Sequence, residues 1–179
     1  MAEVLLRHRL LEQGVDAHVS SAGLYPSGSP ATEHGIEVMA RRGLDTTAHL
    51  SRQLDRQMVA QADLIIGMAR QHVREVAVLD PGALARTFTL KELVTAARGT
   101  GPRHQGESLD QWLARASVGR RRDALLGAGH DEAFDVADPI GGTKGDYEVT
   151  ADELDALLEQ VVRFGWPAGV QDAARERTA

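Results

Sequence analysis

Apolar residues along the chain predict three strands, at 17–23 (AHVSSAG), 62–68 (ADLIIGM) and 86–90 (RTFTL). The segment 62–68 is apolar nearly throughout, which is typical of a parallel strand that is buried on both faces of a sheet. The segment 17–23 is less apolar and ends in a turn of small residues. These positions outline the sheet of the expected fold.

Helical periodicity separates these strands. Residues 2–13 form the first predicted helix, which ends at Gly14, and residues 70–79 form another. Ser29 and Pro30 suit the N-cap and first turn of a further helix. The alternation of helices and strands predicts an α/β fold, in which helices cover both faces of a parallel sheet.

The last helix has a sequence signature at its start and a clear apolar face. Thr150 and Glu153 match a capping box, so we expect the helix to begin there. Its predicted buried stripe repeats at helical spacing. The stripe comprises Leu154, Leu157, Leu158, Val161 and Val162.

The length and composition predict a single domain at residues 1–165. An insertion is expected at about 98–130, because that stretch turns polar and glycine-rich before a helical part. We expect loops at 98–108 and 135–148, helices over LDQWLARAS and RRRDALLGA, and a disordered tail at 166–179.

Charge and hydropathy exclude several classes of protein. The formal net charge of -6 disfavours a general nucleic-acid-binding protein. No apolar run approaches the roughly 20 residues that a bilayer requires, and charged residues interrupt the first apolar stretch, so no signal peptide is expected. The sequence therefore predicts a cytoplasmic protein with no membrane partner.

Five fragments occur in this order: MAEVLLRHRL, VSSAG, ARRGLDTTAHLSRQL, ADLIIGM and VADPIGG. In order and spacing they resemble the low-molecular-weight protein tyrosine phosphatase family, over about residues 1–97 and 134–164. The resemblance implies a three-layer α/β fold. It also implies that the first strand leads into a phosphate-binding loop made of a Cys, five residues, an Arg and Ser-Pro. Met1 would follow that Ser-Pro directly, so we expect the first central strand and the loop to be missing.

The resemblance also implies the chemistry. In the family, backbone N–H groups at a helix N-terminus cradle the phosphate, a thiolate attacks phosphorus, and the loop Arg clamps the oxygens. The expected reaction is phosphomonoester hydrolysis through a cysteinyl-phosphate, without a cofactor, on a phosphorylated protein or a small phosphomonoester. The 179 residues contain no cysteine. We therefore expect an inactive chain, truncated at an internal methionine; the alternative is a genuine, catalytically inactive binding module.

Several positions match family residues. The resemblance assigns Asp138 as the general acid, on a loop held by Pro139, and Ser21 and His49 as residues that brace the phosphate loop from behind. Tyr25 is the candidate wall of the substrate cleft. Where many members carry aromatic residues after Asp-Pro, this chain has Ile140, Gly141 and Gly142, which weakens the expectation of phosphotyrosine specificity. Without the resemblance, Asp-Pro would be interpreted as a turn.

Two other clusters have weaker interpretations. The oxygen-rich stretch GHDEAFDVAD could hold magnesium or calcium through His130, Asp131, Glu132, Asp135 and Asp138, but it lacks the glycine spacing of a calcium loop. No metal site is therefore expected. The run GRRRD (119–123) could bind a polyanion, although such runs usually form a solvated face.

Overall fold

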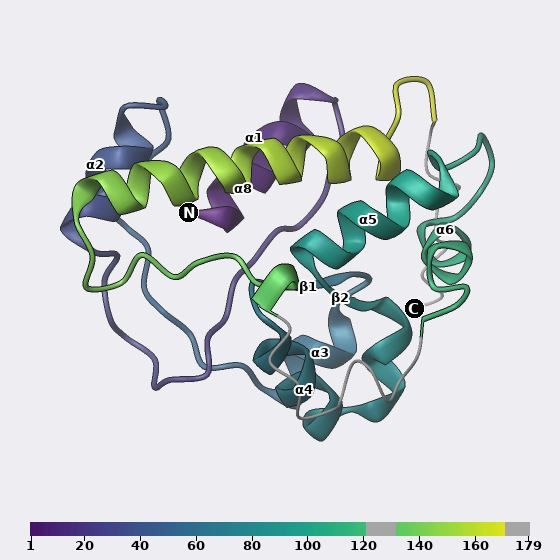
Figure 1. Ribbon diagram of the computed structural model, residues 1–179, viewed down its shortest axis with the longest axis horizontal. Coiled ribbons are helices and arrows are strands. Elements are labelled where there is room, and N and C mark those ends of the chain that lie inside the picture. The colour runs from purple at the N-terminus through teal and green to yellow at the C-terminus, as the bar shows by residue number, and fades with distance from the viewer. Residues whose placement is uncertain (121–131, 171–179) are drawn as a thin grey trace.

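The computed structural model describes residues 1–120 and 132–170 (Figure 1). Its helices and strands, in chain order, are α1 (Ala2–Glu12), α2 (Glu33–Ala40), α3 (Arg56–Gln61), β1 (Ile65–Gly67), α4 (Arg70–Leu79), the 3₁₀ helix η1 (Pro81–Arg86), β2 (Thr87–Thr89), α5 (Leu90–Thr100), α6 (Leu109–Ala116), the 3₁₀ helix η2 (Glu132–Phe134) and α8 (Lys144–Gly165).

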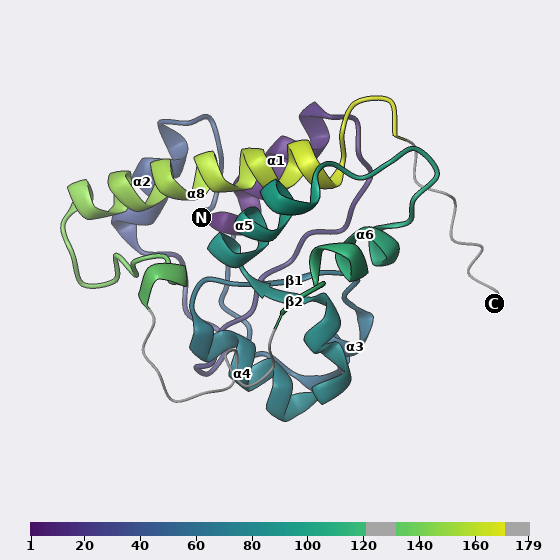
Figure 2. The ribbon, with the colours of Figure 1, turned by 45° about the vertical axis from the view of Figure 1, so that its right-hand side comes forward.

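The two strands β1 and β2 pair in parallel, with Ile65 opposite Thr87 and Gly67 opposite Thr89. Helices α3 and α4 lie on one side of this sheet, and α1, α5 and α8 lie on the other (Figures 1 and 2). The predicted α/β fold, with helices on both faces of a parallel sheet, is confirmed.

The strand predicted at 17–23 is wrong. Within the described residues this segment contains no strand, and its one bridge joins Gly23 to Gln53. A strand requires a continuous ladder of backbone partners, and here the Val19 carbonyl accepts instead from the Arg7 guanidinium at 2.9 Å. An apolar pattern reports which face is buried, and it cannot supply the missing partner.

The helices at 2–13 and 70–79 are confirmed as α1 and α4, but α2 begins later than predicted. Its N-cap is Thr32, whose hydroxyl accepts from the Gly35 N–H at 3.2 Å. Ser29 is engaged elsewhere, because its N–H and carbonyl both bond Ser51, at 3.0 and 2.8 Å. Ser29 and Pro30 are therefore wrong as the helix start.

Helix α8 begins before the predicted position. Thr143 and Asp146 form its capping box, so the loop predicted at 135–148 ends at Thr143. Thr150 is buried inside the helix and donates to the Ala137 carbonyl at 3.4 Å. Thr150 and Glu153 are therefore not the cap.

The apolar stripe of α8 is confirmed: four of its five residues are buried and Leu157 is half-buried. The stripe joins the main hydrophobic cluster, to which α1, α2, β2, α5 and α6 also contribute. Trp166 packs in the same cluster. Residues 171–179 of the predicted tail lie outside the described residues.

The segment 98–120 is more ordered than predicted. Helix α5 continues to Thr100, so 98–100 are helical, and the helix predicted over LDQWLARAS is confirmed as α6. Trp112 of α6 is fully buried, and its indole N–H donates to the Gly101 carbonyl at 3.1 Å.

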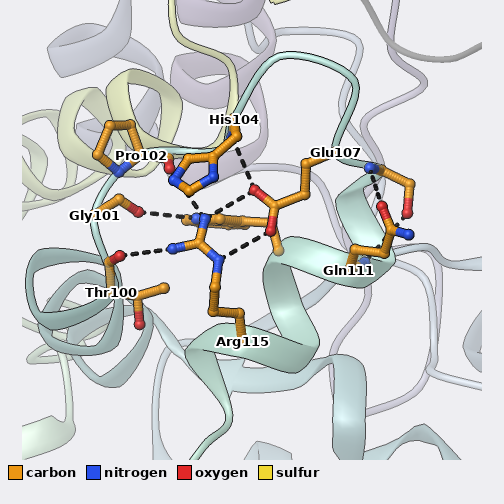
Figure 3. Close-up of polar contacts among 9 residues, drawn as sticks. Thr100, Gly101, Pro102, His104, Glu107, Gln111 and Arg115 are labelled. Carbon is orange, nitrogen blue, oxygen red and sulfur yellow. Dashed lines mark hydrogen bonds and ion pairs between the residues drawn. The ribbon is translucent and has the colours of Figure 1, made fainter.

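Arg115 of α6 holds the loop 101–108 closed (Figure 3). Its guanidinium bonds both carboxylate oxygens of Glu107, at 2.9 and 2.8 Å. It also donates to the carbonyls of Thr100 at 2.7 Å and Pro102 at 3.1 Å. One side chain therefore joins the end of α5, the loop and α6.

Arg120 corrects the interpretation of GRRRD as a solvated face. Its side chain is only 11% exposed, lies over the Phe88 ring at 3.9 Å, and pairs with Glu92 at 2.9 Å. It also donates to the carbonyls of Leu84 and Thr87. These acceptors offset the cost of burying the charge. Residues 121–123 and the helix predicted over RRRDALLGA lie outside the described residues.

Candidate active site

Glu3, in the first turn of α1, brings together two of the residues predicted for the site. The Ser21 hydroxyl donates to one oxygen of the Glu3 carboxylate, and Nδ1 of His49 lies 4.0 Å from the same oxygen. The Arg7 guanidinium donates to the other oxygen. Segments far apart in the sequence thus meet at the N-terminal end of α1.

This arrangement keeps Glu3 ionised. Burial of the carboxylate opposes ionisation, but hydrogen bonds from Ser21 and Arg7 and the nearby charges of Arg7 and His49 outweigh it. They hold the pKa of Glu3 below its ordinary value. Nothing in the sequence pattern singled Glu3 out, since an acidic residue in a first helical turn is common.

Tyr25 lies on a loop that two neighbouring segments hold in place. The Gly23 N–H donates to the Arg52 carbonyl at 2.8 Å, and the Gly28 N–H donates to the Ser51 carbonyl at 2.9 Å. Between these anchors the Tyr25 side chain is 84% exposed. Its ring is therefore accessible to a ligand.

Asp138 and Pro139 form a tight turn. The exposed Asp138 carboxylate accepts from the Ile140 N–H at 3.0 Å, and the Pro139 carbonyl accepts from the Gly142 N–H at 2.9 Å. A side chain at Gly142 would meet Asp146 at 2.8 Å and the Pro139 carbonyl at 3.0 Å. The turn therefore leaves little room for a Cβ at Gly142, and it presents the Asp138 carboxylate to solvent.

The segment before Asp138 contacts the turn between β1 and α4. The Asp135 carboxylate accepts from the Arg70 N–H, and the Val136 N–H donates to the Met68 carbonyl, both at 2.8 Å. In both ribbon views, the loop between η2 and α8 runs below the start of α1 (Figures 1 and 2). The loop that carries Asp138 is thus fixed at the carboxyl end of β1.

His72 lies in the first turn of α4 and contacts the same region. Its Nδ1 accepts from the Ala69 N–H at 3.1 Å, so the proton of the neutral ring is on Nε2. Burial lowers the pKa of His72 below its ordinary value, and the charges of Asp135 and Asp138 partly offset that shift. No sequence pattern indicates a role for His72.

The structure therefore joins Ser21 and His49 at Glu3, while Asp138 and Pro139 form their own turn and Tyr25 stands on an exposed loop. The sequence pattern indicates Asp135 only as a candidate metal ligand, yet its carboxylate accepts from the Arg70 N–H. His130 and Asp131 lie outside the described residues. Among residues 1–120 and 132–170, no three metal-ligating side chains gather.

Residues 1–102 match the family described as low molecular weight phosphotyrosine protein phosphatase. The chain belongs to this family. A protein-arginine-phosphatase of Bacillus subtilis (strain 168) is 28% identical over 164 residues, which span 91% of this chain and 85% of that protein. A probable low molecular weight protein-tyrosine-phosphatase, EpsP, of Ralstonia solanacearum is 39% identical over 94 residues, or 52% of this chain and 62% of that protein.

Solved structures of this phosphatase family share the fold. The low molecular weight protein tyrosine phosphatase from T. tengcongensis superposes with a TM-score of 0.65 and 26% identity, covering 90% of this chain and 87% of that one. The YwlE arginine phosphatase from Geobacillus stearothermophilus gives a TM-score of 0.63 and 27% identity, covering 90% and 80%. As for membrane association, the described part of the chain holds no helix with the length and apolarity of a transmembrane span.

Proposed function

We propose that this chain supplies the scaffold and the general acid of a protein phosphatase that works through a cysteinyl-phosphate. In the first step a thiolate attacks phosphorus, the bond to the leaving group breaks, and Asp138 gives its proton to the departing atom. In the second step Asp138 takes a proton from water, whose oxygen attacks phosphorus and releases inorganic phosphate and the thiolate.

The observation that carries this proposal is the convergence of Ser21 and His49 on Glu3 in the first turn of α1. A helix N-terminus attracts a phosphate group through its free N–H groups and its dipole. Groups that fix the first turn from behind therefore stabilise a phosphate site at that end, which is the role proposed for Ser21 and His49.

The exposure of Asp138 supports its role as the acid. Its carboxylate is accessible to a leaving group, and the bond from the Ile140 N–H limits its rotation. A general acid needs both access and orientation, because proton transfer requires a hydrogen-bond distance to the leaving atom.

The nucleophile is the part of this chemistry that the 179 residues do not contain, since they include no cysteine. We assign it to a loop of a Cys, five residues and an Arg encoded ahead of Met1. The DNA upstream of the Met1 codon tests this directly. An in-frame stop codon there, with no such loop, would favour the inactive binding module.

Two substrate classes compete, phosphotyrosine and phosphoarginine. Ile140, Gly141 and Gly142 provide no aromatic wall after Asp138-Pro139, so stacking on a phenol ring rests on Tyr25 alone in this scheme. Because the aromatic residues are lacking there and the chain is similar to an arginine phosphatase, both phosphotyrosine and phosphoarginine substrates should be tested. Matched peptides carrying either phosphorylated residue, compared by kcat/KM, separate the two; the Tyr25→Ala variant should weaken only the phosphotyrosine reaction.

The activity test uses the chain extended by its upstream segment. Asp138→Asn should lower kcat for phenyl phosphate by about 10²–10⁴-fold, the range of general acid catalysis. The matched control is Asp152→Asn, on the exposed side of α8, which should leave kcat unchanged. The 179-residue chain should not hydrolyse para-nitrophenyl phosphate; turnover by that chain would contradict the assignment of the nucleophile.

A further inference from the structure

Three successive residues, Phe134 to Val136, attach the Asp138 loop to the turn between β1 and α4. The Arg70 guanidinium lies 5.0 Å from the centre of the Phe134 ring. The Asp135 carboxylate and the Val136 N–H make the two 2.8 Å bonds to the backbone of Arg70 and Met68. We propose that Asp135 is a positioning residue, which holds Asp138 where a general acid is needed.

The need for Asp135 arises in α4 itself. The N-cap of α4 is Ala69, whose methyl side chain cannot accept a hydrogen bond. The first N–H groups of a helix have no acceptor within the helix. Asp135, 65 residues further along the chain, supplies the acceptor for the Arg70 N–H. Its negative charge also interacts favourably with the positive end of the helix dipole.

The consequence for Asp138 follows from chain length. Asp138 is three residues after Asp135, and three residues span at most about 10 Å when fully extended. The Val136 bond to Met68 fixes the next residue as well. The contacts with the turn between β1 and α4 therefore fix the point at which the Asp138 turn begins. Loss of the Asp135 acceptor allows Asp138 to leave its position.

This inference rests on the proposed function, because it requires Asp138 to be the acid. Misplacement of a catalytic group by about 1 Å can cost 10²-fold in rate. The cost falls on poor leaving groups, since these need protonation most. A change in Asp135 should therefore show in the dependence of kcat on the leaving group, whereas simple destabilisation would not.

The attachment is tested first on the 179-residue chain by amide hydrogen exchange. Asp135→Ala should speed exchange at Arg70 and Val136 by about fivefold, the loss expected for one helix-capping bond. The matched control is Asp55→Ala: Asp55 caps the Met58 N–H of α3, also at 2.8 Å. It should affect Met58 and leave Val136 protected. Unchanged exchange at Arg70 and Val136 in Asp135→Ala would overturn the attachment.

The positioning role is tested on the extended chain with phenyl phosphate and para-nitrophenyl phosphate. Asp135→Ala should lower kcat by about tenfold or more for phenyl phosphate, the poorer leaving group, and by about threefold or less for the other. Asp135→Asn retains an acceptor oxygen and should recover most of the rate. An equal loss on both substrates would overturn the positioning role.

The two failures are distinguishable. If Asp138→Asn itself shows no dependence on the leaving group while hydrogen exchange responds to Asp135→Ala, the proposed function has failed and the attachment stands. If Asp138→Asn shows that dependence and Asp135→Ala does not, the acid assignment stands and the positioning role has failed.

Discussion

The segments 101–120 and 132–143 are both irregular over much of their length, yet they are fastened by opposite kinds of hydrogen bond. In 101–120, the donors are guanidinium groups of Arg115 and Arg120, and the acceptors include backbone carbonyls. In 132–143, carboxylates of Asp135 and Asp138 accept from backbone N–H groups. At each site the side chain complements the backbone group that it meets: a guanidinium donates to a carbonyl, and a carboxylate accepts from an N–H group.

For Arg115 and Asp135, helix ends explain this difference. Arg115 bonds the carbonyl of Thr100, the last residue of α5, where the helix end is negative. Asp135 bonds the N–H of Arg70, the first residue of α4, where the helix end is positive. The arginines are also more buried than Asp138, so 101–120 serves stability, whereas 132–143 presents an accessible carboxylate.

The largest effect should come from Arg120→Met. The change leaves the Glu92 carboxylate, 17% exposed, without its guanidinium, and removes the donor to the Leu84 and Thr87 carbonyls. Breaking a largely buried pair should lower the free energy of unfolding by about 3 kcal/mol. Urea denaturation measures it, with Arg41→Met as the control. Arg41 pairs with Glu148 at the surface, 62% and 41% exposed, and should cost less than about 1 kcal/mol.

Glu107→Gln should have the next largest effect and should depend on pH. The hydrogen bonds from Arg115 lower the pKa of Glu107 from 4.5 to about 2. A carboxyl group with a lowered pKa stabilises the folded state above pH 4.5 and loses that contribution as the pH falls toward 2. Urea denaturation should therefore show a difference between wild type and variant that is full at neutral pH and shrinks in acid. A difference independent of pH would mean that shape, rather than charge, holds the loop.

Asp135→Ala should lower the free energy of unfolding by about 1 kcal/mol, the usual cost of a lost helix cap. Asp55→Ala removes an equivalent bond from α3 and should cost a similar amount. The two variants should lose similar stability, but only Asp135→Ala should alter amide exchange at Val136. That result would show that Asp135 positions the 132–143 segment and contributes no more stability than an ordinary helix cap. If Asp135→Ala lowered the free energy of unfolding several times more than Asp55→Ala, then 132–143 would serve stability, as 101–120 does.

The smallest effect should be the pH dependence carried by His72. Because the folded state lowers its pKa from 6.5, the unfolded chain binds the proton first, and stability falls as the pH drops below 6.5. His72→Gln keeps an acceptor for the Ala69 N–H but does not titrate. The loss of stability between about pH 7.5 and about pH 5.5 should be smaller in this variant than in wild type.

Local patterns predicted much of the fold, and non-local contacts explain the errors. The run 62–68 and the periodic segment 70–79 each carry their own signal, and both elements formed. The segment 17–23 has a weaker apolar pattern, with Val19 as its only large apolar residue, and a strand also needs a partner, which no local signal provides. Thr150 with Glu153 resembles a helix start because the same signature can occur within a helix; Thr143 with Asp146 is the one used.

The site was predicted only as far as family resemblance reached. Ser21 and His49 meet at one carboxylate, yet no sequence pattern identifies Glu3 as the residue that they share. Asp135 could have been suspected only by noting that Ala69 cannot cap α4, and even then its distance of 65 residues from Arg70 would have hidden the contact. Such pairs depend on the assembled tertiary structure.

Because a single Glu3 carboxylate serves Ser21, Arg7 and His49, these positions cannot vary independently. Replacing any one of them alters the charge and orientation that the other two experience, so their energetic contributions do not add. Ser21 and Arg7 are thereby thermodynamically coupled through the Glu3 carboxylate, to which both donate. Natural substitutions at these positions should therefore occur together.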